Sequence, residues 1–124
     1  LDVRRGDGPK GCFDYTMASI ATTEHLIEAS PDTVAAAIRA IVRTQKALKA
    51  DVSLATKVGD ALFPPQEAAL IAELIRRDLP YYDAVISERS VAGMNDFARG
   101  VGILETDVSY DQVVATEFSE FWQS

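Results

Sequence analysis

Few residues of this sequence could do chemistry. His25 is the only histidine, and Glu28 lies three residues after it, so the two would share one face of a helix and could resemble a metal-binding pair. Carboxylate-bridged metal sites in helical bundles use Glu-x-x-His, in the opposite order and twice, and zinc proteases need two histidines. We therefore expect neither a metal nor another cofactor.

The sequence also contains little evidence for nucleophilic catalysis. Cys12 is the only cysteine, and His25 is the only imidazole that could activate it. Any chain with one residue of each type offers such a pair, and a small buried hydrophobic residue is the commoner role for a lone cysteine. The sequence contains no glycine-rich phosphate-binding motif. We therefore expect a chain that is not an enzyme and has no catalytic residue.

Ligand contacts are predicted at Tyr15 and Thr16. Residues 1–11 contain Gly6, Gly8, Pro9 and Gly11 and are typical of an entering loop or linker. The segment Cys12–Ala21 mixes aromatic and β-favouring residues and is predicted to form one strand. A tyrosine on a strand that leaves a glycine-rich loop could present its hydroxyl group to a cleft. The other aromatic residues are expected in the core.

The remaining residues are predicted to form about five or six helices. Pro31 and Pro65 suit first helical positions, Phe63-Pro64 and Leu79-Pro80 mark breaks, and Gly102 is a C-terminal cap signal. Ser30, Ser53 and Ser87 are predicted N-caps, and Ser109 with Gln112 has capping-box spacing. The apolar positions predict these buried stripes: Val34, Ile38, Ile41 and Leu48; Leu54, Val58 and Leu62; Leu70, Ile71, Leu74 and Ile75.

Composition excludes several classes of protein. With 19 acidic against 12 basic residues the net charge is -7, which repels phosphate backbones, so nucleic acid is not expected as a partner. No apolar run approaches the roughly 20 residues that span a bilayer, so no direct membrane span is expected. The opening Leu1–Arg5 is neither an initiator nor a signal peptide, so we expect a cut or processed end without its signal peptide.

Several motifs together resemble a known family. Ser30-Pro31-Asp32-Thr33-Val34 leads into Ala37-Ile38-Arg39-Ala40, and later come Phe63-Pro64-Pro65, Arg76-Arg77-Asp78-Leu79-Pro80-Tyr81-Tyr82 and Val91-Ala92-Gly93-Met94-Asn95-Asp96-Phe97. This order is similar to the C-terminal part of periplasmic solute-binding proteins of ABC transporters, in the group related to thiamine-pyrimidine synthase and to nitrate, taurine and alkanesulfonate binders. The similarity spans most of residues 10 to 122.

The resemblance implies a mainly α fragment of a two-lobed α/β periplasmic-binding-protein fold, with residues 12–124 forming the C-terminal helical portion of one lobe. It implies a bacterial periplasmic (extracytoplasmic) protein that captures a small-molecule ligand and delivers it to an ABC permease. The His-Cys-Cys-Cys-Gly motif of the pyrimidine-forming members has no counterpart in this sequence. The resemblance therefore implies transport and carries over no catalytic residue.

The predicted strand has no partner strand in this sequence. The segment Cys12–Ala21 cannot satisfy its backbone N–H and C=O groups by itself, and the sequence supplies no adequate partner strand. Either a missing part of the chain or another copy must complete the sheet, so self-association through residues 12–21 is one expectation. The alternative to a transport function is a stand-alone helical protein–protein interaction domain with an acidic surface.

Overall fold

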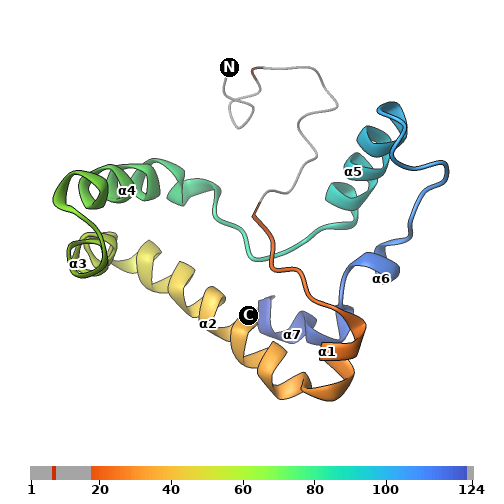
Figure 1. The fold of residues 1–124 in the computed structure, drawn as a ribbon, viewed down its shortest axis with the longest axis horizontal. Helices are drawn as coiled ribbons and strands as arrows, with labels where there is room; N and C mark the ends of the chain where they lie inside the picture. Colours follow the sequence, from red (N-terminus) through yellow and green to blue (C-terminus); the bar gives the residue numbers. More distant parts are fainter. Residues whose placement is uncertain (1–6, 8–17, 123–124) are drawn as a thin grey trace. The chain divides into compact units, whose positions relative to one another are not determined.

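A computed structural model describes residue 7 and residues 18–122. It contains α1 (Glu24–Ala29), α2 (Pro31–Ala50), α3 (Ser53–Leu62), α4 (Pro65–Asp78), α5 (Glu88–Gly100), α6 (Tyr110–Val113), α7 (Ser119–Trp122) and the 3-10 helices η3 (Leu79–Tyr81) and η4 (Thr116–Phe118) (Figure 1). These elements belong to two compact units. The first unit comprises residues 30–84, and the second combines α1 with the segment from Val85 onward.

The mainly helical prediction is confirmed, whereas the predicted N-terminal strand is not supported. Residues 18–21 are described and are not part of a strand, and the remainder of the predicted strand, residues 12–17, lies outside the described residues. None of the described residues forms a strand with another. A strand requires a ladder of backbone hydrogen bonds, and the described helices offer no free edge for one. No described helix has the length and apolar character needed to cross a membrane.

Proline residues begin and end the helices as predicted. Pro31 and Pro65 occupy the first turns of α2 and α4, where a missing N–H group leaves no hydrogen bond unmade. Phe63 and Pro64 separate α3 from α4 in extended conformations. Helix α4 ends at Asp78 and continues into η3, which contains Pro80. The boundaries of the helices in residues 30–84 therefore follow from local sequence.

Ser30 occupies the N-cap position of α2 as predicted, whereas Ser53 is the first residue of α3 and not its N-cap. The side chain of Ser30 makes no capping hydrogen bond, and the backbone carbonyl of Ser30 accepts from the N–H of Val34 instead. At α3 the N-cap position is Val52, and the side chain that satisfies the first turn is that of Asp51, whose Oδ1 accepts from the Ser53 N–H at 3.0 Å. Hydrogen bonds from the Ser53 side chain and backbone favour the charged carboxylate and lower the pKa of Asp51 below its ordinary 3.8.

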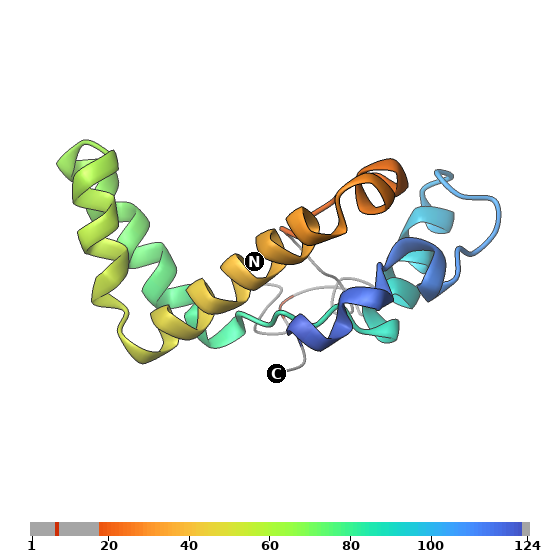
Figure 2. The same ribbon diagram turned by 90° about the horizontal axis from the view of Figure 1, so that it is seen from below.

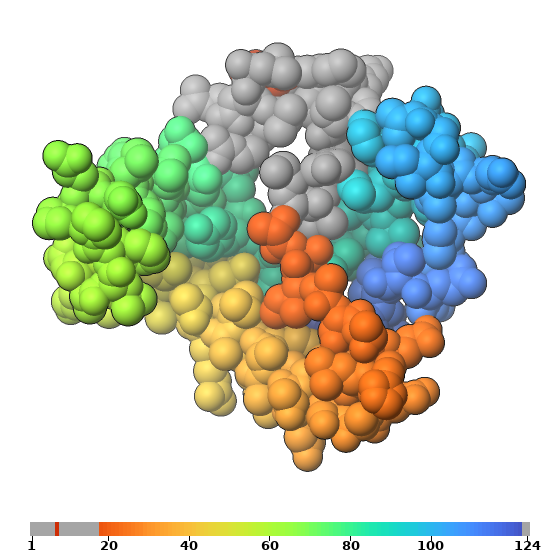
Figure 3. All heavy atoms as spheres, viewed as in Figure 1, coloured from red at the N-terminus to blue at the C-terminus, as the bar shows by residue number. Residues whose placement is uncertain are grey.

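Helices α3 and α4 form a hairpin through very small residues. Ala55 and Gly59 of α3 are buried, as are Ala68 and Ala72 of α4, which are 1% and 5% exposed. A Cβ atom at Gly59 would lie 3.3 Å from the Cβ of Ala68, so the two helix backbones approach closely at this point. Figures 1 and 2 show the two helices side by side, and the space-filling view shows their atoms in continuous contact (Figure 3).

The predicted buried stripes of large residues are shifted. Val58 and Leu62 of α3 are 57% and 69% exposed, and Leu70 and Leu74 of α4 are 61% and 39% exposed, whereas Ile71 and Ile75 are half-buried. The reason is geometric, because close approach through glycine and alanine leaves no space between the helices for larger side chains. The hairpin therefore buries its small residues fully and leaves four of its larger ones exposed.

Helix α2 shows the same displacement. Its buried residues are Val34, Ala35 and Val42, whereas Ile41, predicted at the centre of the stripe, is 48% exposed. At about 100° per residue, Ala35 and Val42 lie on one flank of Val34, and Ile41 lies on the other. The buried face is therefore rotated toward the smaller residues.

A long-range polar contact within the first unit links the end of α2 to the segment after η3. The Nζ of Lys49, at the end of α2, donates a hydrogen bond of 2.8 Å to the backbone carbonyl of Tyr82, just after η3. Tyr82 adopts an extended backbone, which leaves this carbonyl outside the helical hydrogen-bond pattern. The contact therefore links the helix that precedes the hairpin to the segment that follows it.

Candidate functional site

The predicted ligand-binding residues Tyr15 and Thr16 lie outside the described residues, as does Cys12. His25 and Glu28 both lie on α1, and both are exposed. Within the described part of the chain, no group of three or more histidine, cysteine, aspartate or glutamate residues could hold a metal ion. The described residues therefore bring no predicted site residues together.

A set of connected polar contacts lies around α5. Its N-cap is Ser87, as predicted, since Ser87 Oγ accepts from the N–H of Ser90 at 3.1 Å. Its C-terminus closes at Gly102, also as predicted, with a φ of 76° that favours glycine. The N–H of Ile103 reaches the carbonyl of Ala98 at 2.8 Å and that of Gly102 reaches Arg99, which is the Schellman pattern. Both ends of α5 are thus fixed by local chemistry.

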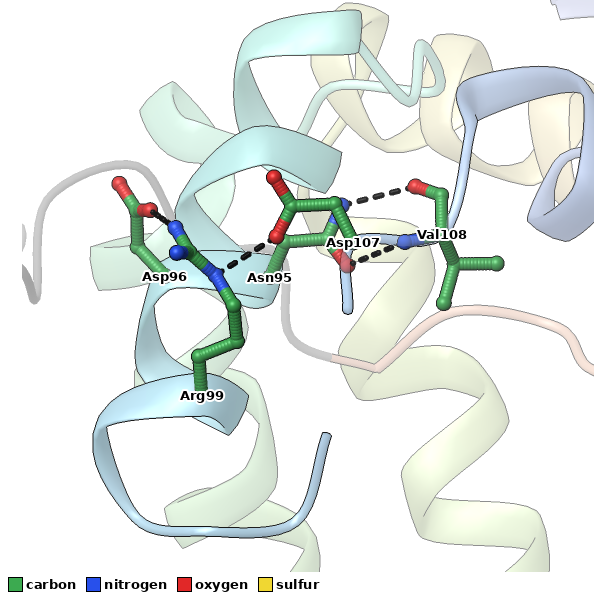
Figure 4. Close-up of polar contacts among 5 residues, drawn as sticks. All are labelled: Asn95, Asp96, Arg99, Asp107 and Val108. Atoms are coloured by element: carbon green, nitrogen blue, oxygen red, sulfur yellow. Dashed lines mark hydrogen bonds and ion pairs between the residues drawn. The ribbon is translucent and has the colours of Figure 1, made fainter. Parts of the chain in front are cut away.

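Asn95 holds the chain that follows α5. Its Nδ2 donates to the carbonyl of Val108 at 2.8 Å, and its Oδ1 accepts from the N–H of Val108 at 3.1 Å (Figure 4). Asn95 is only 9% exposed, so these two bonds satisfy a side chain that would otherwise be costly to bury. The amide group thereby acts toward Val108 as a neighbouring strand would, supplying one donor and one acceptor.

Arg99 adds ionic contacts one turn further along α5. Its Nη2 lies 2.5 Å from Asp96 Oδ1, and its Nε lies 2.6 Å from Asp107 Oδ1. Figure 4 shows the guanidinium group between these two carboxylates, one from the helix and one from the loop. All three side chains are substantially exposed, so each pair contributes modestly to stability, about 0.2–1 kcal/mol. We call Asn95, Arg99, Asp107 and Val108 the polar clasp.

Two further contacts surround the polar clasp. Tyr110 Oη donates to the carbonyl of Ile86 at 2.7 Å and so joins the start of α6 to the segment before α5. Gln112 Oε1 accepts from both the N–H and the hydroxyl of Ser109, at 3.0 Å each, as the capping-box spacing predicted. The segment from Ile86 to Gln112 is therefore closed on itself by side-chain hydrogen bonds.

This arrangement positions the loop that follows α5. Both atoms of the Asn95 amide are engaged with the backbone, and Arg99 is neutralised by carboxylates on each side. The loop that the polar clasp holds has an apolar surface, because Val101 and Ile103 are 55% and 72% exposed. The contacts therefore hold a loop with exposed apolar residues in one position on the surface.

The aromatic C-terminal segment is partly packed, in keeping with the expected core role. Phe118 is 6% exposed, and its ring is stacked with that of Phe121 at a centroid distance of 6.4 Å. The Nε1 of Trp122 is buried and has no hydrogen-bond partner among the described atoms. An unsatisfied buried donor costs about 1–3 kcal/mol, so the indole N–H of Trp122 does not stabilise this segment. Apolar packing of the rings must therefore stabilise it.

Sequence reasoning missed the polar clasp, although one signal was present. Asn95 lies on the same side of α5 as Val91, Met94 and Ala98, all at least half-buried, and a polar residue at such a position must find a partner. The identity of that partner could not be read, because Val108 contributes only its backbone. No known protein family matches this chain, and neither a curated protein nor a solved structure is similar to it.

Proposed function

We propose that this chain is the helical portion of a solute-binding component of an ABC importer, which captures a small molecule and delivers it to a membrane permease. The proposal combines the motif resemblance with one structural observation that carries it. That observation is how little apolar surface the described helices bury among themselves.

The core of the described residues is small. Its eight hydrophobic members are Val34, Ala35, Val42, Ala55, Ala68, Ala72, Val114 and Phe118, and half of them are alanine. Fourteen large hydrophobic residues of the same helices and loops are exposed. Burying a large apolar side chain contributes about 1.5–3 kcal/mol, so this surface is a large unused source of stability. Helices with this property are expected as the outer layer of a larger layered fold.

A two-lobed binding protein supplies the missing layer in the form of sheets. Helices that cover a sheet turn one apolar side to it and keep their mutual contacts small. The described residues contain helices alone, so the strands and most ligand contacts are expected from other residues. Under this proposal the polar clasp serves as a scaffold that fixes a covering loop, and it is not the ligand site.

Calorimetric titration of the full reading frame's product beside the 124-residue chain tests the proposal. Taurine, nitrate and an aminopyrimidine are the three probes. We expect the longer protein to bind one of them with micromolar affinity and the 124-residue chain to bind none, because a two-lobed cleft needs both walls to exclude water. Micromolar binding by the short chain alone, or no binding by the longer protein, would contradict the proposal.

The second candidate is a helical interaction domain. The α3/α4 hairpin favours it, because its two helices close on each other through Ala55, Gly59, Ala68 and Ala72 without needing another layer. A stand-alone domain requires cooperative unfolding of the isolated chain. A sharp urea transition together with a reading frame that begins near Leu1 supports this candidate, whereas a longer frame with a signal peptide excludes it.

A further inference from the structure

Helix α4 is apolar on two sides. Its inner side, with Ala68 and Ala72, is buried in the hairpin. Its outer side carries Leu70 and Leu74, which are 61% and 39% exposed and lie one turn apart. A helix with apolar residues on both sides normally has a neighbour on both sides. The described residues supply the inner neighbour only.

The outer side also has an ordered charge pattern. Glu67 lies one turn before Leu70, and Arg77 lies one turn after Leu74, so the spacing is i, i+3, i+7 and i+10. At about 100° per residue these four positions fall within roughly 80° of one another and away from the inner side. We call Glu67, Leu70, Leu74 and Arg77 the outer stripe. From N- to C-terminus it presents acid, leucine, leucine and base.

The outer stripe is complementary to itself when reversed. Counted from Ala72, Leu70 and Leu74 are equally far on either side, and so are Glu67 and Arg77. We propose that a second copy of this chain docks on the outer stripe in the antiparallel direction, through a two-fold axis that crosses the outer stripe at the level of Ala72 along the helix. Leu70 of one copy then contacts Leu74 of the other, and Glu67 of one copy faces Arg77 of the other. Such an interface is closed, so association stops at the dimer.

Charge selects this direction. A parallel pair would place Glu67 beside Glu67 and Arg77 beside Arg77, and like charges across an interface are unfavourable. Arg77 already lies 3.1 Å from Asp78 of its own chain, but its side chain is 53% exposed and the guanidinium group has five donors. It can therefore hold a second carboxylate without losing the first.

The expected dimer is weak and depends on concentration. One helix pair centred on two leucines per copy buries less than the roughly 1,200 Å² at which standard interfaces begin. The net charge of -7 also opposes association of two copies. This inference uses only the surface of α4 and does not depend on the proposed transport function; it assigns Leu70 and Leu74 to a second copy and not to the missing layer.

Sedimentation equilibrium of the 124-residue chain, measured over a wide concentration range, tests the docking. We expect a monomer–dimer equilibrium whose dissociation constant rises about tenfold or more in Leu70→Glu. The matched control is Ile103→Glu, which places the same charge on a 72%-exposed residue of the other unit and is expected to leave the dissociation constant unchanged. Circular dichroism verifies that both variants keep the helicity of the wild type.

Charge exchange tests the direction. Glu67→Arg and Arg77→Glu are each expected to weaken self-association, because every copy then carries like charges at both ends of the stripe. An equimolar mixture of the two variants pairs opposite charges at both ends and is expected to recover a dissociation constant within about threefold of wild type. A wild-type chain that stays monomeric, a dimer that survives Leu70→Glu, or variants that do not associate on mixing would each overturn the proposal.

Discussion

The α3/α4 hairpin and the polar clasp both fix chain segments, but they use different forces. Each fixes one segment of chain against a helix. The hairpin does so with four alanine and glycine residues and almost no space between its backbones, whereas the polar clasp uses one amide, one guanidinium group and a loop. The first is sensitive to volume and the second to hydrogen-bonding capacity. Substitutions that change only one of these properties should therefore separate the two regions.

The largest effect is expected from Gly59→Leu. Since a Cβ atom at this position already meets Ala68 at 3.3 Å, the remaining side-chain atoms must push the helices apart, at a cost of up to about 3 kcal/mol. Urea denaturation followed by circular dichroism measures this loss. Gly59→Ala is expected to be nearly neutral, because its better helix propensity offsets a tight contact.

The control for the hairpin is Gly100→Leu. A Cβ atom at Gly100 meets nothing within 4 Å, so the same change in volume is expected to cause no loss of stability. If Gly59→Leu were as stable as Gly100→Leu, close approach at Gly59 would not hold the hairpin, and the contrast with the polar clasp would fail.

An intermediate effect is expected from Asn95→Ala. The substitution leaves the N–H and the carbonyl of Val108 without their partner, and water can reach them in part, so we expect a loss of about 1–2 kcal/mol. Thermal unfolding measures it. Asp96→Ala, next in sequence and on the exposed side, removes a surface ion pair and is expected to cost less than about 1 kcal/mol. Equal losses would show that the amide contributes no more than a surface charge.

The smallest effect concerns pH and lies at the start of the hairpin. Because the pKa of Asp51 is lowered on folding, its contribution to stability is present above its ordinary value of 3.8 and is lost as pH falls below that value. The difference in unfolding temperature between wild type and Asp51→Asn should therefore shrink below pH 3.8. In Ser53→Ala, which removes one of the hydrogen bonds to the carboxylate, the pH dependence should be weaker. A difference that stays constant through acid pH would exclude this role for Asp51.

The ends of helices were predictable from sequence, and their faces were not. Pro31, Pro65 and Gly102 act through their own backbone geometry. Ser87 acts through a hydrogen bond to its own helix, so none of these effects depends on the rest of the fold. Ile41 was misplaced because hydrophobic periodicity weights large residues, whereas this chain packs on small ones. Alanine favours helices everywhere, so its use as a contact residue leaves no distinct signal.

The candidate site was less predictable than the fold. The predicted strand after a glycine-rich loop directed attention to Tyr15 and Thr16, which lie outside the described residues and remain predictions. The polar clasp joins Asn95 to a backbone group 13 residues away, and such a pairing depends on the path of the intervening loop. The one signal in the sequence was the position of Asn95 among apolar residues on one side of α5.

The hydrogen bond from Lys49 to the Tyr82 carbonyl has a consequence for the order of folding. Its partners are 33 residues apart, and closing a flexible loop of that length costs roughly 3 kcal/mol in chain entropy before any constant term. A hydrogen bond to a charged group returns only about 1.5–3 kcal/mol, and less when it is exposed. The bond cannot draw the ends together by itself. We expect α3 and α4 to pack first, because their connection is short. The hydrogen bond from Lys49 to Tyr82 should form only afterwards, when that packing has reduced the loop-closure entropy that remains.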